Sequence, residues 1–242
     1  MIQGFYDAAA GLLVENDRTS VLASNLANAT TVGYMARGVE IAATPFREVF
    51  LQQSGQLAIG AMPTGAELVK SYLDPGPGPV ERTGVATDIA LTRSGLFAVR
   101  TPQGVRYTRA GDLSVNARGE LVTAQGDLVL GTRGAIHVGT GRLAIDPGGQ
   151  VRVNGRPVDQ LRLVSGTGLT LVDTGQGRYA VVAGRPRPYR GQVIQGALNL
   201  STVSEVRTMS SALSAYRAFS LDFQALQAES STMKLATQAA QV

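Results

Sequence analysis

The apolar residues of the first 28 positions recur at steps of three and four, which is the period of a one-sided α-helix. The pattern predicts a helix from about residue 2 to residue 28. Its apolar positions are Ile2, Phe5, Ala9, Leu12, Leu13, Leu22 and Leu26. This stripe is wider than the seam of a two-stranded coiled coil, so one partner helix would not cover all of it.

A second helical pattern begins near Ser201 and runs to the end of the chain. Ser201 or Thr202 is a suitable N-cap, and Glu205 lies in the first turn, as in a capping box. One apolar row contains Val206, Met209, Leu213, Tyr216 and Phe223; a neighbouring row contains Phe219, Leu226 and Met233. A helix of about 40 residues with such a stripe is typical of a coiled coil or a helix bundle.

Between about Val80 and Val193 the period changes to two, which indicates short β-strands. The strands are separated by turn signals such as PQG, ARG, QGD, PGGQ and NG, and this spacing is typical of an antiparallel sandwich or an irregular barrel. Pro- and Gly-rich segments at 72–84 and 183–196 bound the region. Residues 35–72 show some helical periodicity at Phe46, Val49 and Phe50.

These patterns predict an α+β fold. The long N- and C-terminal helices pair as a coiled-coil-like domain, and a mainly antiparallel β module is inserted between them. Neither helix can bury its stripe alone, so we expect the two to cover each other and the remaining apolar surface to contact other copies. The expected division is 1–34 with 196–242 as an assembly domain, 35–79 as a connecting segment, and 80–195 as the β-rich module.

The composition changes this picture in one respect. Charged residues make up only 17% of the 242 positions and hydrophobic residues 44%. A surface rich in Ala, Ser, Thr and Gln can be buried against other chains without a large desolvation cost. The net charge is +4, but the arginines are scattered, so we expect no nucleic-acid binding. There is no cysteine, which suits an oxidising compartment.

The N-terminus and the hydropathy predict neither membrane insertion nor a cleaved signal. No run of about 18 apolar residues occurs, so no membrane span is expected. The first 20 residues lack a basic segment and carry Asp7, Glu15 and Asp17 within the apolar period. They therefore do not form a cleavable secretory signal.

Candidate chemistry is sparse. The single histidine, His137, lies between Ile136 and Val138, and strand alternation points it to solvent. Without cysteine, and with one histidine, most zinc sites and a Cys-His pair are excluded. No G-x-S-x-G element supports a Ser-His-Asp triad. Asp112, Asp127 and Asp146 stand at turns, where carboxylates bond local backbone. We expect no enzyme, no metal and no cofactor.

One short stretch, SNLANATTVGY (Ser24–Tyr34), is unusual for the end of a helix. Asn25 and Asn28 can bond free backbone groups, Gly33 can take a left-handed conformation, and Tyr34 or Met35 can anchor the chain to a neighbour. An ordinary helix cap followed by a loop explains the stretch equally well.

This stretch resembles the N-L-A-N-x-x-T-x-G-[FY] motif of the bacterial flagellar rod and hook family, the axial proteins of the basal body. Residues 83–131 are similar to that family's middle signature, with T-G-x-x-x-D-x-A, G-x-F, Y-T-R-x-G and G-x-L-V-T. Residues 193–219 are similar to its C-terminal Q-G-x-L-x-x-S-x-V segment and long helix. Within the family, the chain looks most like the proximal rod member and next like the distal one.

The resemblance implies a structural subunit of the rod that transmits torque. It implies export without a cleaved signal through the flagellar type III apparatus, helical assembly with other rod and hook subunits, and a periplasmic position in the basal body. The expected assembly interface is Phe5, Leu12, Leu22, Asn25, Leu26, Asn28, Gly33, Tyr34, Val206, Leu213, Tyr216 and Phe223. A secreted β-rich binding module is the alternative from another class, although the chain has no Trp and only 5% aromatic residues. A cell-wall hydrolase is a third hypothesis, but this sequence shows neither a metal site nor the paired carboxylates that such an enzyme would need.

Overall fold

The computed structural model describes residues 2–43, 47–51, 57–62 and 66–239. Contacts divide the chain into two compact units. We call them the helical unit (1–26, 37–72 and 205–242) and the β-rich unit (27–36 and 73–204). Each unit is therefore assembled from segments that are distant in the sequence.

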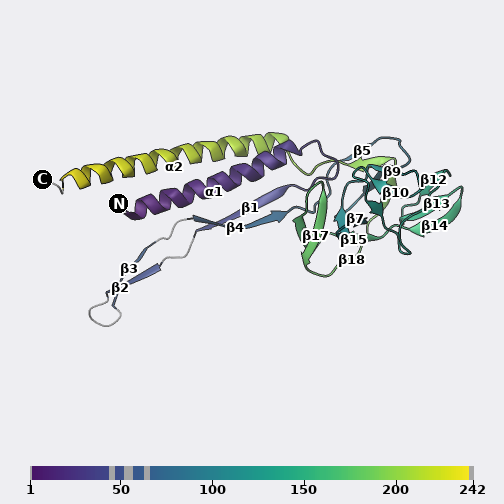
Figure 1. Ribbon diagram of the computed structural model, residues 1–242, viewed down its shortest axis with the longest axis horizontal. Helices are drawn as coiled ribbons and strands as arrows, with labels where there is room; N and C mark the ends of the chain where they lie inside the picture. The colour runs from purple at the N-terminus through teal and green to yellow at the C-terminus, as the bar shows by residue number, and fades with distance from the viewer. Residues whose placement is uncertain (1, 44–46, 52–56, 63–65, 240–242) are drawn as a thin grey trace. The chain divides into compact units, whose positions relative to one another are not determined.

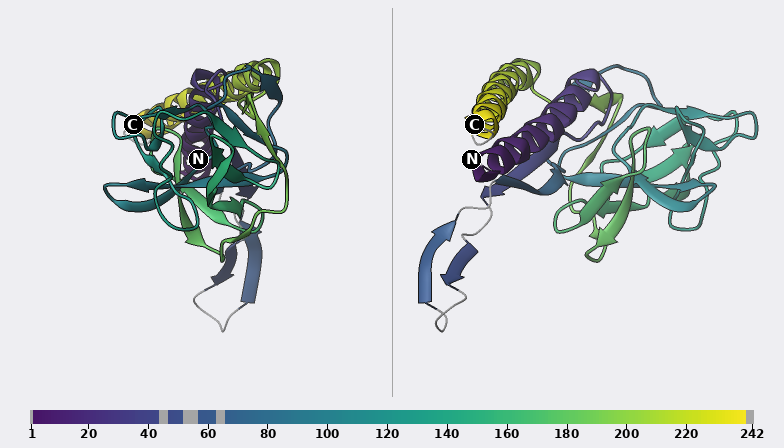
Figure 2. Two further views of the ribbon diagram at one scale, coloured as in Figure 1. Left: turned by 90° about the vertical axis from the view of Figure 1, so that its right-hand side faces the viewer. Right: turned by 60° about the vertical axis from the view of Figure 1, so that its left-hand side comes forward.

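The helical unit contains α1 (Ile2–Ala27), α2 (Glu205–Ala239) and four strands. The helices run side by side (Figures 1 and 2), and a Cβ on Gly11 of α1 would lie 2.8 Å from a carboxylate oxygen of Asp222 on α2. The strands form two pairs, β1 (Arg37–Ala43) with β4 (Ala66–Leu73), and β2 (Arg47–Leu51) with β3 (Leu57–Met62). No helix of the described chain is long and apolar enough to cross a membrane.

The β-rich unit is built around a nine-stranded sheet with the order β16-β17-β8-β7-β11-β10-β9, in which β15 also pairs with β7 and with β18. Its strands are β7 (Gly95–Thr101), β8 (Gly104–Thr108), β9 (Leu113–Val115), β10 (Leu121–Thr123), β11 (Leu128–Val129), β15 (Leu163–Ser165), β16 (Thr170–Asp173), β17 (Arg178–Ala183) and β18 (Arg187–Pro188).

Three smaller sheets complete this unit. They are the meander β12 (Leu143–Ile145), β13 (Gln150–Val153) and β14 (Arg156–Gln160), the pair β6 (Ile89–Leu91) with β19 (Val193–Gln195), and the pair β5 (Val80–Arg82) with β20 (Ala197–Asn199). All of these pairings are antiparallel. Two apolar clusters fill the unit, one around Phe97 and Leu121 and one around Met35, Leu96 and Tyr179.

The predicted fold class is wrong. Among the described residues the chain has two helices and twenty strands, so it is mainly β rather than a coiled-coil-like domain with an inserted β module. The helices do not bury the predicted stripe, because Val206, Leu213 and Tyr216 of α2 stay 82%, 60% and 68% exposed. The buried residues of α2 are Thr208 and Ala215.

The helical reading of residues 35–72 is wrong as well. This segment contributes strands β1 to β4, and Val49 and Phe50 lie in β2; Phe46 is outside the described residues. By contrast, the period-two strands were predicted correctly, and His137 is exposed between the buried Ile136 and Val138.

Candidate functional site

The motif Ser24–Tyr34 begins at the end of α1 with a buried asparagine. The Asn25 side chain donates from Nδ2 to the carbonyl of Arg37 at 2.8 Å, and its Oδ1 accepts from the Arg37 N–H at 2.9 Å. Only a side-chain amide offers a donor and an acceptor side by side in this way. Asn25 thereby fixes the first residue of β1 against the last turn of α1, within the helical unit.

The second half of the motif is part of the β-rich unit. Gly33 donates its N–H to the carbonyl of Asn199 at 2.8 Å and has a φ of 65°. A Cβ at this position would overlap the backbone of Arg109 and Ala110. Glycine is therefore required here for two reasons, the left-handed backbone and the close approach of a second chain segment.

The residues after Gly33 continue this attachment. The carbonyl of Tyr34 accepts from the N–H of Thr202 at 3.0 Å, and the hydroxyl of Thr202 accepts from the N–H of Ala36 at 2.7 Å. The N–H of Met35 donates to the Tyr179 hydroxyl at 3.2 Å. Met35 is fully buried in the second apolar cluster, so its thioether side chain fills the core of its own chain.

Asn199 lies in the segment 193–219, which resembles the family's C-terminal signature, and it contacts the segment 83–131, which resembles the middle signature. Its side chain is fully buried, accepts from the Leu91 N–H at 2.7 Å and donates to the Leu91 carbonyl at 3.0 Å. Since the backbone carbonyl of Asn199 also accepts from Gly33, this residue joins β6, β20 and the N-terminal motif. The three sequence blocks that carry the resemblance therefore meet in the β-rich unit.

Arg109, from the Y-T-R-x-G block, is a fully buried cation behind this meeting point. It donates from Nη1 to the Pro75 carbonyl at 2.9 Å and from Nη2 to the Arg93 carbonyl at 3.2 Å. Burial lowers the pKa of the guanidinium, an effect partly offset by Tyr189, Asp74 and Tyr179. The residue thus attaches the Pro- and Gly-rich segment after β4 to the sheet.

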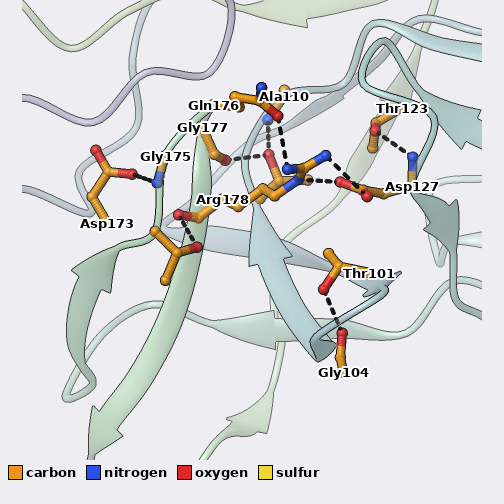
Figure 3. A network of polar contacts seen from close by, with 12 residues as sticks. Thr101, Gly104, Ala110, Thr123, Asp127, Asp173, Gly175, Gln176, Gly177 and Arg178 are labelled. Atoms are coloured by element: carbon orange, nitrogen blue, oxygen red, sulfur yellow. Dashed lines mark hydrogen bonds and ion pairs between the residues drawn. The ribbon is translucent and has the colours of Figure 1, made fainter.

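A second polar network supports the loop that Gly33 approaches (Figure 3). The Arg178 guanidinium forms a two-point ion pair with Asp127, in which Nη2 lies 3.1 Å from Oδ1 and Nε bonds Oδ2. Nearby, the Thr108 hydroxyl donates to the Gly177 carbonyl at 2.8 Å and accepts from the Ala110 N–H at 3.1 Å. The second of these hydrogen bonds holds the N–H of Ala110, whose backbone faces Gly33.

The structure divides the predicted interface residues into three groups. Asn25, Gly33 and Tyr34 are buried within this chain, and Leu12, Leu22 and Asn28 are partly buried. Leu26, Val206, Leu213, Tyr216 and Phe223 are exposed. The side chain of Phe5 lies outside the described residues. Contact of these residues with other subunits stays a prediction.

Sequence reasoning missed Asn199, Tyr179 and Arg109 as partners of the motif. Arg109 and Asn199 stand inside the quoted blocks 83–131 and 193–219, so the blocks themselves held the signal. No local pattern marked Tyr179. The part of the chain that the structure describes contains no group of three acidic, His or Cys side chains placed to hold a metal ion.

Comparison with known proteins agrees with the geometry. Residues 90–153 match the family described as the flagellar hook protein FlgE/F/G D1 domain. These residues include Arg109, Ala110 and Leu91, which contact the N-terminal motif or its partner Asn199.

Several curated relatives are flagellar basal-body rod proteins. FlgF of Mesorhizobium japonicum is 32% identical over 123 residues, and the chain spans about half of that relative, 47%. FlgF of Escherichia coli is 29% identical over 248 residues, with 93% of each chain covered. FlgG of Caulobacter vibrioides is 25% identical over 244 residues, with 91% of this chain and 93% of the relative covered.

The family match covers residues 90–153, and the similarity to the Escherichia coli and Caulobacter vibrioides relatives extends over 93% and 91% of the chain. These similarities support the rod and hook family of bacterial flagellar axial proteins for this chain.

Proposed function

We propose that this chain is a structural subunit of the flagellar basal-body rod, where it assembles helically with other axial proteins and transmits torque. The observation that carries the proposal is the apolar surface of α2, on which Val206, Leu213 and Tyr216 are each at least 60% exposed. Exposed apolar side chains in one row are typical of a protein contact surface. A position in the proximal rod fits the FlgF relatives, and a position in the distal rod is the alternative.

The assembly domain in this proposal comprises the terminal segments 1–34 and 196–242. Its contact residues are Phe5, Leu12, Leu22 and Leu26 in α1, and Val206, Leu213, Tyr216 and Phe223 in α2. Different faces of one subunit meet in such a contact, so the arrangement does not close and propagates as a helical rod. The proposed interface also includes Asn25, Asn28, Gly33 and Tyr34, and Asn25 holds the last turn of α1 through its two hydrogen bonds to Arg37.

The same proposal includes the route to the rod. The subunit passes through the flagellar type III export apparatus, keeps its N-terminus, and takes its place in the periplasmic part of the basal body.

The experiment uses strains of the source bacterium that lack the chromosomal copy and carry a variant. In the stripe variant, Leu213 and Tyr216 are both changed to Asp. In the control, Val182, an apolar residue of β17 that is 67% exposed, is changed to Asp. Purified basal bodies are probed for the subunit, and swimming is recorded.

We expect the stripe variant to be made and exported but absent from basal bodies, with loss of swimming, because each introduced charge must be desolvated in the contact. The control variant should enter basal bodies normally. Normal incorporation of the stripe variant would show that α2 does not form the contact and would overturn the proposal.

A further inference from the structure

A cleft of about 630 Å³ lies on the β-rich unit. Its walls come from the turn after β6, the end of β15 and the segment around β18. We call it the basic cleft and define it by Arg93, Ser94, Ser165, Thr167, Arg187, Tyr189 and Arg190, which line it together with Pro77, Thr92 and Pro188.

The charge of the basic cleft is uniformly positive. Arg93, Arg187 and Arg190 are exposed, and no acidic residue is among the lining residues. Within the described chain none of these three guanidinium groups forms an ion pair, whereas Arg118, Arg133, Arg152 and Arg178 each pair with a carboxylate. The chain therefore leaves the arginines of the cleft available to a negatively charged ligand from outside.

One wall of the cleft is fixed in advance. The Tyr189 hydroxyl accepts from the Arg93 N–H at 3.1 Å and donates to the Gln192 carbonyl at 3.2 Å. Its ring lies where a Cβ on Gly95 or on Gly191 would be, so both positions are kept free of side chains. A fixed aromatic wall lowers the ordering cost of binding.

The edge of the sheet beside the cleft disfavours binding by strand addition. β18 pairs with β15 and contains Pro188, which has no N–H, and Pro186 precedes it. A ligand here is thus recognised by side chains. Guanidinium groups bind carboxylates through two parallel hydrogen bonds, and the Ser94, Ser165 and Thr167 hydroxyls can serve main-chain amides.

We propose that the basic cleft binds an acidic, extended segment of another polypeptide. Three arginines around one cleft match successive carboxylates, while Tyr189 and the prolines contact the apolar part of a peptide chain. Among the described residues, Asp127, Asp146 and Asp159 are already paired with arginines of their own chain. The positive charge of the cleft suits an acidic segment of a different protein, whichever place the subunit takes in the rod.

The test measures binding of fluorescently labelled hexaglutamate to the full-length chain by anisotropy, at low salt and at physiological salt. Hexaglutamine is the uncharged control, and inorganic polyphosphate is offered as a competing type of anion. The cleft variant carries Arg187→Gln and Arg190→Gln. The matched control carries Arg118→Gln and Arg156→Gln, which removes the same charge from two exposed positions outside the cleft. Circular dichroism verifies that all variants are folded.

Hexaglutamate should bind, hexaglutamine should not, and the cleft variant should bind hexaglutamate at least about tenfold more weakly than the control variant. If hexaglutamate binding were weakened equally in both variants, the net charge of the protein would explain the effect, and the proposal would be overturned. Absence of hexaglutamate binding would overturn it too, and tight binding of polyphosphate alone would assign the cleft to a phosphate polymer instead.

Discussion

Asn25 and Asn199 perform the same task at two places in the chain. Each side-chain amide bonds both the N–H and the carbonyl of one backbone residue, Arg37 in the first case and Leu91 in the second. An amide used in this way supplies the hydrogen-bond donor and acceptor that the backbone of a neighbouring strand would otherwise provide. At the scale of residues, the family motifs therefore encode internal hydrogen bonds of the subunit as well as any contact between subunits.

Gly33→Ala should destabilise the β-rich unit strongly. The left-handed backbone costs about 1–2 kcal/mol for alanine, and overlap with the backbone of Arg109 and Ala110 adds about 1–3 kcal/mol. Gly155→Ala is the matched control, since Gly155 has a φ of 77° and no atom within 4 Å of its Cβ position. Urea unfolding measures both; an equal loss in the two variants would argue against close packing at Gly33.

Replacing Asp112 and replacing Asp159 should change the stability of the protein in opposite directions at neutral pH. Burial raises the pKa of Asp112, and the nearby Asp88 adds to this effect although a backbone hydrogen bond opposes it. Burial also acts to raise the pKa of Asp159, but hydrogen bonds from Thr132 and the backbone, together with Arg133, outweigh it and leave that pKa lowered.

The sign of each effect follows from linkage. A raised folded-state pKa means that Asp112 favours folding at acid pH and loses this contribution as pH rises through that pKa. Asp112→Asn should therefore be more stable than the wild type at pH 7, with the difference vanishing towards pH 3. Asp159→Asn should be less stable at pH 7, and its deficit should shrink as pH falls. Urea unfolding at a series of pH values checks both; a destabilised Asp112→Asn at pH 7 would contradict the burial argument.

At the scale of elements, α2 presents two neighbouring rows with a seven-residue step. Thr208 and Ala215 are buried and Asp222 is partly buried, whereas Met209 and Tyr216 in the adjacent row are more than half exposed. Periodicity predicts that a helix is one-sided, but it does not say which of two adjacent rows meets a partner in the isolated chain. The row with small and polar residues packs in the subunit, and the apolar row stays outside.

This division predicts unequal effects of the same substitution on α2. Ala215→Gln should destabilise the helical unit by about 1–3 kcal/mol, because a larger polar side chain enters a buried position. Leu213→Gln should change stability by no more than about 0.5 kcal/mol in the isolated chain, since the side chain is 60% exposed. Hydrogen exchange of α2 amides and thermal unfolding measure the difference. Comparable losses in both variants would mean that Leu213 is covered in the isolated chain.

At the scale of the whole molecule, the chain changes unit four times. Residues 27–36 belong to the β-rich unit, whereas the segments on either side, 1–26 and 37–72, belong to the helical unit. A short segment is thus fixed by hydrogen bonds from Gly33, Met35 and Ala36 to residues more than 140 positions away. Residues 1–72 therefore contribute segments to both units.

Limited trypsin digestion of the isolated chain should reveal this arrangement. Cleavage should begin in α2, after Arg207 and Arg217, because both are exposed on a helix with few buried residues. The peptide that contains residues 27–36 should remain bound to the 73–204 core after the chain is cut on both sides, held by the buried Met35. Native mass spectrometry detects the retained peptide, and its early loss would contradict the assigned packing.

Local sequence patterns were enough to predict the two terminal helices, the short antiparallel strands, the outward position of His137 and the resemblance to the axial family. These follow from local period, turn residues and contiguous motifs, all of which are readable along the chain. Local patterns did not reveal strands β1 to β4, where a helical spacing at Val49 and Phe50 was misleading.

The covered side of α2 and the residues around the N-terminal motif became known only from the packing of distant segments. Gly33 meets Ala110 and Asn199, and Met35 meets Tyr179, across sequence separations that no local pattern encodes. The physical reason is that periodicity selects a face of an element, whereas the partner of that face depends on packing between distant segments. In this protein, packing between distant segments leaves the apolar row of α2 exposed and buries part of the N-terminal motif.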